Sequence, residues 1–276
     1  MKPSVQRQAL AAAVGAARAA GQLMRANLRA PKVVNATTAY DIKLELDVRS
    51  QQLIEKILRA AFPQIALLGE EGDSGAVNEE YRWIVDPIDG TVNFAYGIPH
   101  ACVSIALQGR SLKFKGQSLK SGKAGGRDPQ YDTLVGVILD PFQAELWTAI
   151  RGQPARLNGR VIQVSRRRAL KEAIVSMGFG KSRVNLERGL PQFGWLVRRV
   201  RRVRMMGAAA LGVAYVASGR YDAYLERSVS LWDVAAGGLI LECAGGKFWT
   251  EPIRGRNKLR MVASNGLLHD QIPRPR

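Results

Sequence analysis

Long hydrophobic runs are missing from this sequence. No apolar stretch approaches the ~20 residues of a membrane-spanning helix, and the longest, near 208–218 and 234–244, are short and rich in glycine and alanine. Cysteine is scarce as well, because Cys102 and Cys243 stand far apart and neither belongs to a Cys-x-x-Cys pair. These absences argue against a membrane protein, a disulfide-stabilised scaffold and a zinc finger, and they favour the reducing cytoplasm.

Acidic residues are few compared with basic ones. The chain has 41 Lys and Arg but only 23 Asp and Glu, which gives a formal net charge of +18. A field of that sign attracts anions such as phosphorylated metabolites, nucleic acids and anionic membranes, and charge alone does not choose among them. The first acidic residue is Asp41, so the N-terminal stretch has the charge of a transit peptide. We prefer to interpret it as a surface helix that ends before Pro31.

Basic residues concentrate in three runs. Residues 110–127 hold six Lys and Arg between two apolar, strand-like segments, and they predict a basic hairpin insertion over 110–131. The other runs are 166–168 and the five arginines of 198–204. Nucleic-acid-binding surfaces often interleave aromatic side chains with such charges. Only Phe114 and Trp195 lie near, so we favour solvated, phosphate-attracting faces and keep a nucleic-acid interface as the alternative.

The 276 residues suit one domain, in which we allow two lobes with a seam near 150–170. Periodicity predicts helices over 50–62, 186–200, 209–218 and 231–244. Short apolar runs predict strands over 65–69, 81–85, 103–107, 133–139, 145–150, 173–179, 221–226, 247–250 and 259–263. This alternation predicts a layered α/β fold with a mixed sheet.

Three acidic motifs stand out against the basic background. The most informative is the segment 83–94, in which Asp86 follows an apolar strand and Asp89 comes three residues later, with Pro87 and Gly90 bracketing a turn. Two carboxylates and the Ile88 carbonyl are hard oxygen ligands of the kind that Mg²⁺ prefers, and the Thr91 hydroxyl lies just beyond. An ordinary surface turn is the alternative for this motif alone.

The other two motifs are ambiguous when taken singly. Glu70 and Glu71 follow a predicted strand and could form a solvated turn. Asp233 stands at the start of a predicted helix, where the helix dipole favours an acidic residue without any metal.

Together the motifs resemble the inositol monophosphatase family of Mg²⁺-dependent, lithium-sensitive phosphatases. The resemblance covers about residues 41–265 and rests on order and spacing. The main matching segments are Gly69-Glu70-Glu71, Asp86-Pro87-Ile88-Asp89-Gly90-Thr91-Val92-Asn93-Phe94 and Trp232-Asp233-Val234-Ala235-Ala236-Gly237. Supporting segments are 140–146, 157–160, 218–226 and 242–246. The resemblance implies the αβαβα sandwich of the inositol monophosphatase and fructose-1,6-bisphosphatase type.

The resemblance also implies roles for individual residues. The metal ligands it implies are Glu70, Asp86, the Ile88 carbonyl, Asp89 and Asp233. Glu70 and Thr91 would orient the attacking water. Asp47, which like Asp41 matches an acidic position of the family, would support the metal site or a third ion. The alternative for Asp47 is a helix N-cap. The substrate contacts it implies are Gly90, Thr91, Gly207, Ala208, Ala209, Glu226 and Asp233.

Two departures from the family pattern concern the substrate. Leu44 stands where the family usually has a threonine, and Ala208 stands where it often has a serine or threonine. Both changes remove hydroxyl groups that we expect near the substrate, while the implied metal ligands are intact.

The function implied by the resemblance is hydrolysis of a small phosphate monoester with two or three Mg²⁺ ions. Inositol 1-phosphate is the first choice of substrate, with histidinol phosphate and other sugar or nucleotide phosphates as alternatives. A homodimer in the cytoplasm, acting on a phosphorylated metabolite and without a membrane partner, is expected. The alternative from another class is a nucleic-acid-associated binding protein that uses the basic surface.

Overall fold

The computed structural model describes residues 1–39, 42–75, 80–111, 131–180 and 182–275. Its larger sheet has eight strands in the order β10-β9-β8-β7-β6-β5-β3-β4. These strands are β3 (Ala66–Gly69), β4 (Gly72–Ser74), β5 (Tyr81–Asp89), β6 (Cys102–Arg110), β7 (Tyr131–Asp140), β8 (Glu145–Ile150), β9 (Arg156–Leu157) and β10 (Arg160–Val161). The pair β3–β5 is parallel and the other neighbours are antiparallel, so the sheet is mixed as the sequence predicts.

The smaller sheet has five strands in the order β12-β11-β13-β15-β14. They are β11 (Ile174–Gly178), β12 (Arg202–Arg204), β13 (Ala223–Ser230), β14 (Lys247–Pro252) and β15 (Lys258–Ser264). A separate two-stranded ribbon joins β1 (Val34–Thr37) to β2 (Ile42–Leu44). The chain passes from the larger sheet to the smaller one over 162–173, at the end of the seam that the sequence suggests; the division into lobes itself stays a prediction.

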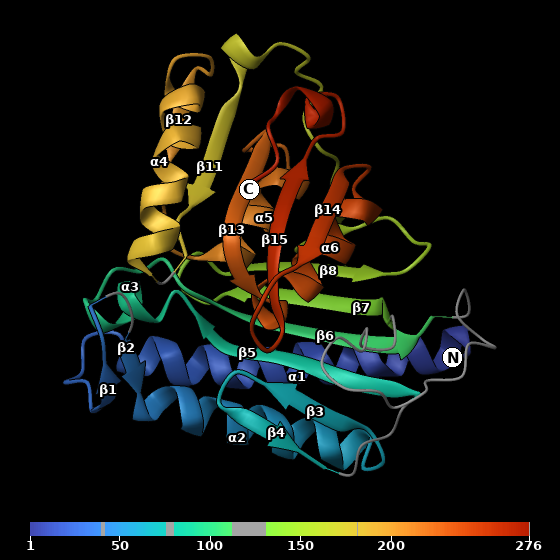
Figure 1. The fold of residues 1–276 in the computed structure, drawn as a ribbon. Coiled ribbons are helices and arrows are strands. Elements are labelled where there is room, and N and C mark those ends of the chain that lie inside the picture. The colour runs from blue at the N-terminus through green and yellow to red at the C-terminus, as the bar shows by residue number, and fades with distance from the viewer. Residues whose placement is uncertain (40–41, 76–79, 112–130, 181, 276) are drawn as a thin grey trace, which may run out of the picture.

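Helices complete five layers. In Figure 1, α1 and α2 lie below strands β5 to β8 of the larger sheet, and the smaller sheet lies above these strands with α4 at its left. The outer pair, α1 (Pro3–Asn27) and α2 (Glu45–Ala61), covers one face of the larger sheet. Between the two sheets lie α5 (Ala209–Ala217) and α6 (Leu231–Cys243), and α4 (Arg183–Val197) covers the outer face of the smaller sheet. The αβαβα sandwich is therefore confirmed.

Small side chains explain how the helices approach the sheets. In α1, alanines at positions 9, 13, 16, 17 and 20 are fully buried at helical spacing, which lets the helix lie close against the larger sheet. The middle layer is built the same way, because α5 is apolar on every side, α6 is apolar and buried from Val234 to Leu241, and both helices pack between the sheets. No helix among the described residues is long and apolar enough to cross a membrane.

Three of the differences between the predicted and observed boundaries concern the site or the arginine run. Helix α2 begins at Glu45 rather than residue 50, so Asp47 lies inside its first turn. Strand β5 continues past Val85 to Asp89, with an irregular register between Asp86 and Asp89, where the sequence predicts a turn. Helix α4 ends at Val197, and three residues of the arginine run form the edge strand β12.

The strands that flank the predicted basic insertion pair antiparallel, with Arg110 opposite Tyr131. Residues 112–130, which hold most of that insertion, lie outside the described residues, as does Asp41.

Candidate active site

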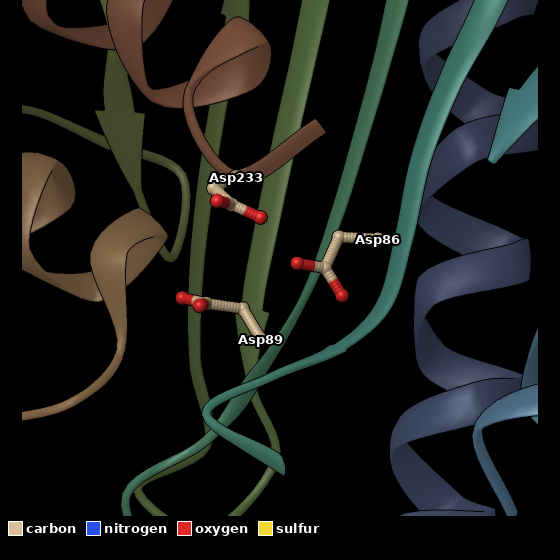
Figure 2. A group of neighbouring side chains, drawn as sticks. All are labelled: Asp86, Asp89 and Asp233. Atoms are coloured by element: carbon tan, nitrogen blue, oxygen red, sulfur yellow. The ribbon is translucent and has the colours of Figure 1, made fainter. Parts of the chain in front are cut away.

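Three aspartates converge between the two sheets (Figure 2). Asp86 and Asp89 lie on β5 of the larger sheet, and Asp233 lies in the first turn of α6. One carboxylate oxygen of each residue lies within 4.8 Å of one from each of the other two. The structure thus brings together carboxylates that are far apart in the sequence.

The irregular end of β5 positions the first two carboxylates. Asp86 Oδ1 accepts the backbone N–H of Ile88 at 3.0 Å, and the Thr91 hydroxyl donates to the Ile88 carbonyl at 2.9 Å. Gly90 follows with φ of 89°, in the left-handed region that favours glycine. A Cβ at Gly90 would lie 2.9 Å from the His100 carbonyl oxygen, so a side chain is excluded there by space as well. The five-residue helix α3 (Thr91–Ala95) begins directly afterwards.

Asp89 is also held from the middle helical layer. Its Oδ1 accepts the backbone N–H of Ala209 at 3.1 Å, and its Oδ2 accepts that of Ala210 at 2.7 Å, at the start of α5. The predicted substrate residue Ala209 is therefore hydrogen-bonded to a predicted metal ligand through its backbone.

Asp233 fits both interpretations that the sequence allows. Its Oδ2 accepts the backbone N–H of Ser230 at 2.8 Å, which is the capping role expected in the first turn of a helix. Its side chain also points toward Asp86 and Asp89 (Figure 2).

The electrostatics of the cluster are unfavourable without a cation. Burial raises the pKa of Asp86 well above its ordinary value, and the charges of Glu70, Asp89 and Asp233 add to that effect. Burial raises the pKa of Asp89 to about 8, with a further contribution from Asp233, although the Ala209 and Ala210 amides oppose it. Hard carboxylate oxygens that resist ionising together are a donor set that suits a hard divalent cation such as Mg²⁺.

The three aspartates line a cavity of about 360 Å³. Glu70, which follows β3, lines it too, and its charge contributes to the raised pKa of both Asp86 and Asp89. The other predicted site residues that line it are Ile88, Gly90, Thr91, Gly207, Ala208, Ala209 and Glu226. A larger hollow, about 800 Å³, lies near the end of α6 and contains none of these residues.

Two residues at the cavity make contacts that are not expected from the sequence. Tyr224, which is buried, donates its hydroxyl hydrogen bond to Glu226 Oε2. Tyr224 lies two residues before Glu226 on a predicted strand, so the spacing indicates that the two side chains lie on the same face of the sheet. Asn93 donates from Nδ2 to the His100 carbonyl at 2.9 Å and to the Met206 carbonyl at 2.7 Å, which fixes the segment before Gly207.

Two residues on the N-terminal side do not line the cavity. Asp47 is buried inside the first turn of α2, and its Oδ2 accepts the Leu44 backbone N–H at 2.7 Å. It therefore helps to cap the helix, but the N-cap residue itself is Leu44 and not Asp47 as the alternative interpretation has it. The expectation that Leu44 lies near the substrate is wrong, because its side chain packs in the core between α1, α2 and the larger sheet. Ala208 does line the cavity.

Comparison with known proteins identifies the family of the chain. The family model described as "Inositol monophosphatase family" matches residues 5–111 and 130–271, which leaves out only a central segment within the basic insertion and the two ends. The chain belongs to the inositol monophosphatase family. Members of this family are phosphoric monoester hydrolases, and the chain is an enzyme of that class.

Similar proteins carry two kinds of name. "Nus factor SuhB" of Pseudomonas aeruginosa is 40% identical over 242 residues, which are 85% of this chain and 82% of that protein. "Inositol-1-monophosphatase" of Rhizobium meliloti is 36% identical over 220 residues, 79% of this chain and 74% of that protein. The structure of extragenic suppressor protein suhB from Bartonella henselae matches with a TM-score of 0.80 and 30% identity, covering 95% of each chain.

Proposed function

We propose that this protein hydrolyses a small phosphate monoester in a Mg²⁺-dependent reaction, with inositol 1-phosphate as the preferred substrate. The observation that carries the proposal is the convergence of Asp86, Asp89 and Asp233 in a cavity of an otherwise strongly basic protein. Carboxylates concentrated at one point of a cationic chain, where burial opposes their charge, indicate a site for divalent cations.

The metal sites would use the side chains that line the cavity. We assign Glu70, Asp86, the Ile88 carbonyl and Asp89 to one ion, and Asp86, Asp89 and Asp233 to a second. Bound Mg²⁺ supplies charge neutralisation for the phosphoryl oxygens, a more acidic water and stabilisation of the leaving oxygen. Asp47 would support the metal site indirectly, because its side chain fixes the start of α2.

The remaining residues bind and orient. Thr91 and Glu70 would hold the attacking water, and the Thr91 hydroxyl is already oriented by the Ile88 carbonyl. The phosphate would lie against the backbone at Gly90 and Thr91, where no side chain blocks its approach. Glu226, which is held by a hydrogen bond from the Tyr224 hydroxyl, would accept a hydrogen bond from a hydroxyl group of the leaving alcohol. A carboxylate at that end favours a polyol over an apolar alcohol.

The substrate choice rests on this polyol end and on the relatives named inositol-1-monophosphatase. Histidinol phosphate and other sugar or nucleotide phosphates are the alternatives, since Ala208 removes a hydroxyl from the cavity wall. The test is phosphate release from a panel of inositol 1-phosphate, histidinol phosphate, glycerol 2-phosphate, fructose 1,6-bisphosphate and 3′-phosphoadenosine 5′-phosphate, with and without Mg²⁺. We expect Mg²⁺-dependent turnover with a clear preference for inositol 1-phosphate.

The same assay tests the metal assignment. Asp89→Ala is expected to lower kcat by at least about a hundredfold, because a ligand shared by both ions is lost. Asp270→Asn is the matched control, since Asp270 is 83% exposed and far from the chemistry, and it is expected to keep full activity. Full turnover by Asp89→Ala would overturn the metal assignment.

A second candidate function is association with nucleic acid. It is favoured by the five exposed arginines between Arg198 and Arg204, which follow α4 and include Arg202 and Arg204 of the edge strand β12, and by relatives named "Nus factor SuhB". The side chains are solvated and lie at a sheet edge, where a polyanion can approach.

An RNA titration at several salt concentrations tests this candidate. We expect micromolar affinity at physiological salt and a steep loss of affinity as salt rises, because each phosphate contact releases counterions. Replacing Arg199 and Arg201 by glutamine should reduce the salt slope by about two. The same change at the exposed Arg156 and Arg160 is the control. Equal slopes for both double variants would reject the arginine edge as the interface.

Three further expectations belong to the same proposal: lithium inhibition, a homodimer and a cytoplasmic location. Lithium can be added to the phosphate-release assay, and sedimentation measures the oligomeric state. Mg²⁺-dependent activity that is indifferent to lithium would reject the first expectation, and a monomer at micromolar concentration would reject the second.

A further inference from the structure

Arg227 is an unusual residue on the outer side of the smaller sheet. It follows Glu226 on β13, and alternation along the strand turns it away from the cavity toward the face that α4 covers. Only 7% of its surface is exposed. Its Nε is fully buried, and among the described residues no group accepts a hydrogen bond from this guanidinium.

The nearest charges around Arg227 are also positive. Residues 227 and 228 lie in the irregular register between β13 and β15, where they face Arg260. Arg188 approaches from α4 and, with Arg260 and burial, lowers the pKa of the Arg227 guanidinium.

Glu251, the acidic residue opposite Arg260, already forms an ion pair with Arg260. Glu251 stands opposite Arg260 on β14 and pairs with it at 3.3 Å, while half of the Glu251 side chain remains exposed. Arg260 also donates to the Pro275 carbonyl at 3.5 Å, and Gln192 of α4 donates to the Pro273 carbonyl at 2.6 Å. The last described residues thus connect α4 with β15 through carbonyl oxygens.

A buried guanidinium without an acceptor destabilises a folded protein, because a charge removed from water needs a partner of opposite charge. We propose that Arg227, Arg188 and Arg260 form a binding site for a phosphate-type oxyanion between α4 and the smaller sheet, separate from the active-site cavity. The planar guanidinium donates two parallel hydrogen bonds to such an anion, and three arginines can surround a dianion. The burial of Arg227 favours a terminal phosphate group over a polymer backbone.

Metal-free conditions separate this site from the active site. In EDTA, the active-site cavity has no cation to hold phosphate, so phosphate binding then reports the arginine site. The measurement is ³¹P line broadening of inorganic phosphate, together with the melting temperature in phosphate against chloride at equal ionic strength. A nucleoside 5′-monophosphate forms a second arm and distinguishes free phosphate from phosphate carried on a metabolite.

Three variants decide the outcome. Arg227→Met is expected to weaken phosphate binding about tenfold or more, and to raise the melting temperature in chloride, since it removes an unpaired buried charge. Arg188→Gln changes an exposed residue and is expected to weaken binding without harm to the fold. Arg183→Gln is the control, because this exposed arginine of the same helix pairs with Glu187 instead.

Equal phosphate binding by the wild type, Arg227→Met and Arg188→Gln would overturn the proposal. So would a lower melting temperature of Arg227→Met in chloride, because that result would mean the guanidinium already has a partner within the protein. Neither outcome bears on the phosphatase activity, which is measured with Mg²⁺ on the other side of the sheet.

Discussion

At the scale of single residues, Asp89 has two opposing sets of neighbours. Backbone N–H groups of Ala209 and Ala210 stabilise its charge, while burial and Asp233 oppose it and raise its pKa to about 8. A proton and a cation therefore compete for the same carboxylate near neutral pH.

This competition predicts how pH affects the stability of the metal-free protein. Asp89 binds a proton in the folded state up to about pH 8, whereas its unfolded pKa is 3.8. The folded state then holds more protons between these values, so stability falls as pH rises through that window. We expect the melting temperature in EDTA to decline from pH 5 to pH 8, and Mg²⁺ to stabilise the protein more at pH 8 than at pH 6.

Asp89→Asn provides the comparison for that measurement. It should flatten the decline in EDTA and abolish most of the stabilisation by Mg²⁺. A wild-type melting temperature that rises from pH 6 to pH 8 in EDTA would contradict the raised pKa.

Gly90 leads to a second prediction at this scale. Gly90→Ala places a Cβ 2.9 Å from the His100 carbonyl oxygen in a left-handed backbone, so we expect a loss of about 1–3 kcal/mol in unfolding free energy and a lower kcat. Gly152→Ala is the control, since Gly152 also has positive φ but a Cβ there would meet nothing within 4 Å. Equal effects of the two changes would show that space at Gly90 is not restrictive.

The residues of the site could be predicted only in part. Asp86 and Asp89 share one motif, but their meeting with Asp233 depends on how the middle helices pack between the sheets, which no local spacing encodes. Resemblance to a family supplied that link. The expected position of Leu44 is wrong. A sequence match gives the position of a residue along the chain but not the direction of its side chain, and the apolar Leu44 side chain packs into the core instead of the cavity.

At the scale of elements, one buried carboxylate makes several of the contacts that hold the chain between the two sheets. Asp222, fully buried before β13, accepts from the Arg167 guanidinium at 2.9 Å, from the Ile174 backbone N–H at 2.7 Å and from the Ser165 hydroxyl. These contacts attach the connecting segment to the first residue of β11.

We expect Asp222→Ala to lower the unfolding free energy by about 3–5 kcal/mol, since the partners of a buried charge are left unsatisfied. Glu187→Ala, which breaks the exposed pair with Arg183, should cost less than about 1 kcal/mol. Denaturant unfolding measures both values. A cost for Asp222→Ala as small as that for Glu187→Ala would mean that the segment is held by other contacts.

Elements were predictable where their own residues carry the signal. Apolar runs such as 103–107 and 133–139 form buried central strands, and Pro31 follows the first helix as expected. Strand β12 was missed because it is an edge strand made of Arg202, Val203 and Arg204, and its pairing with β11 comes from the sheet. The early start of α2 depends on Asp47, whose cap contact is visible only in three dimensions.

At the scale of the whole molecule, a cluster of acidic groups lies inside a protein with a net charge of +18. The positive surface attracts anionic substrates from a distance, whereas the acidic interior attracts cations only once they enter the cavity. Attraction of this kind acts on the encounter with substrate and is screened by salt.

We therefore expect kcat/KM to fall several-fold as KCl rises from about 0.02 to 0.3 M, while kcat changes little. The measurement holds free Mg²⁺ constant, and sucrose at equal osmolarity serves as the uncharged control. A kcat that falls in parallel with kcat/KM would instead place the salt effect in the chemical step.

The division of the three aspartates between β5 and the start of α6 has a consequence for synthesis. A growing polypeptide that has already made the whole larger sheet still lacks Asp233, so it cannot assemble the triad of carboxylates. Chains that stop before residue 233 should then neither bind divalent cations at this place nor cleave phosphate esters, and the capacity for both arises only after Asp233 has been added and α6 has formed.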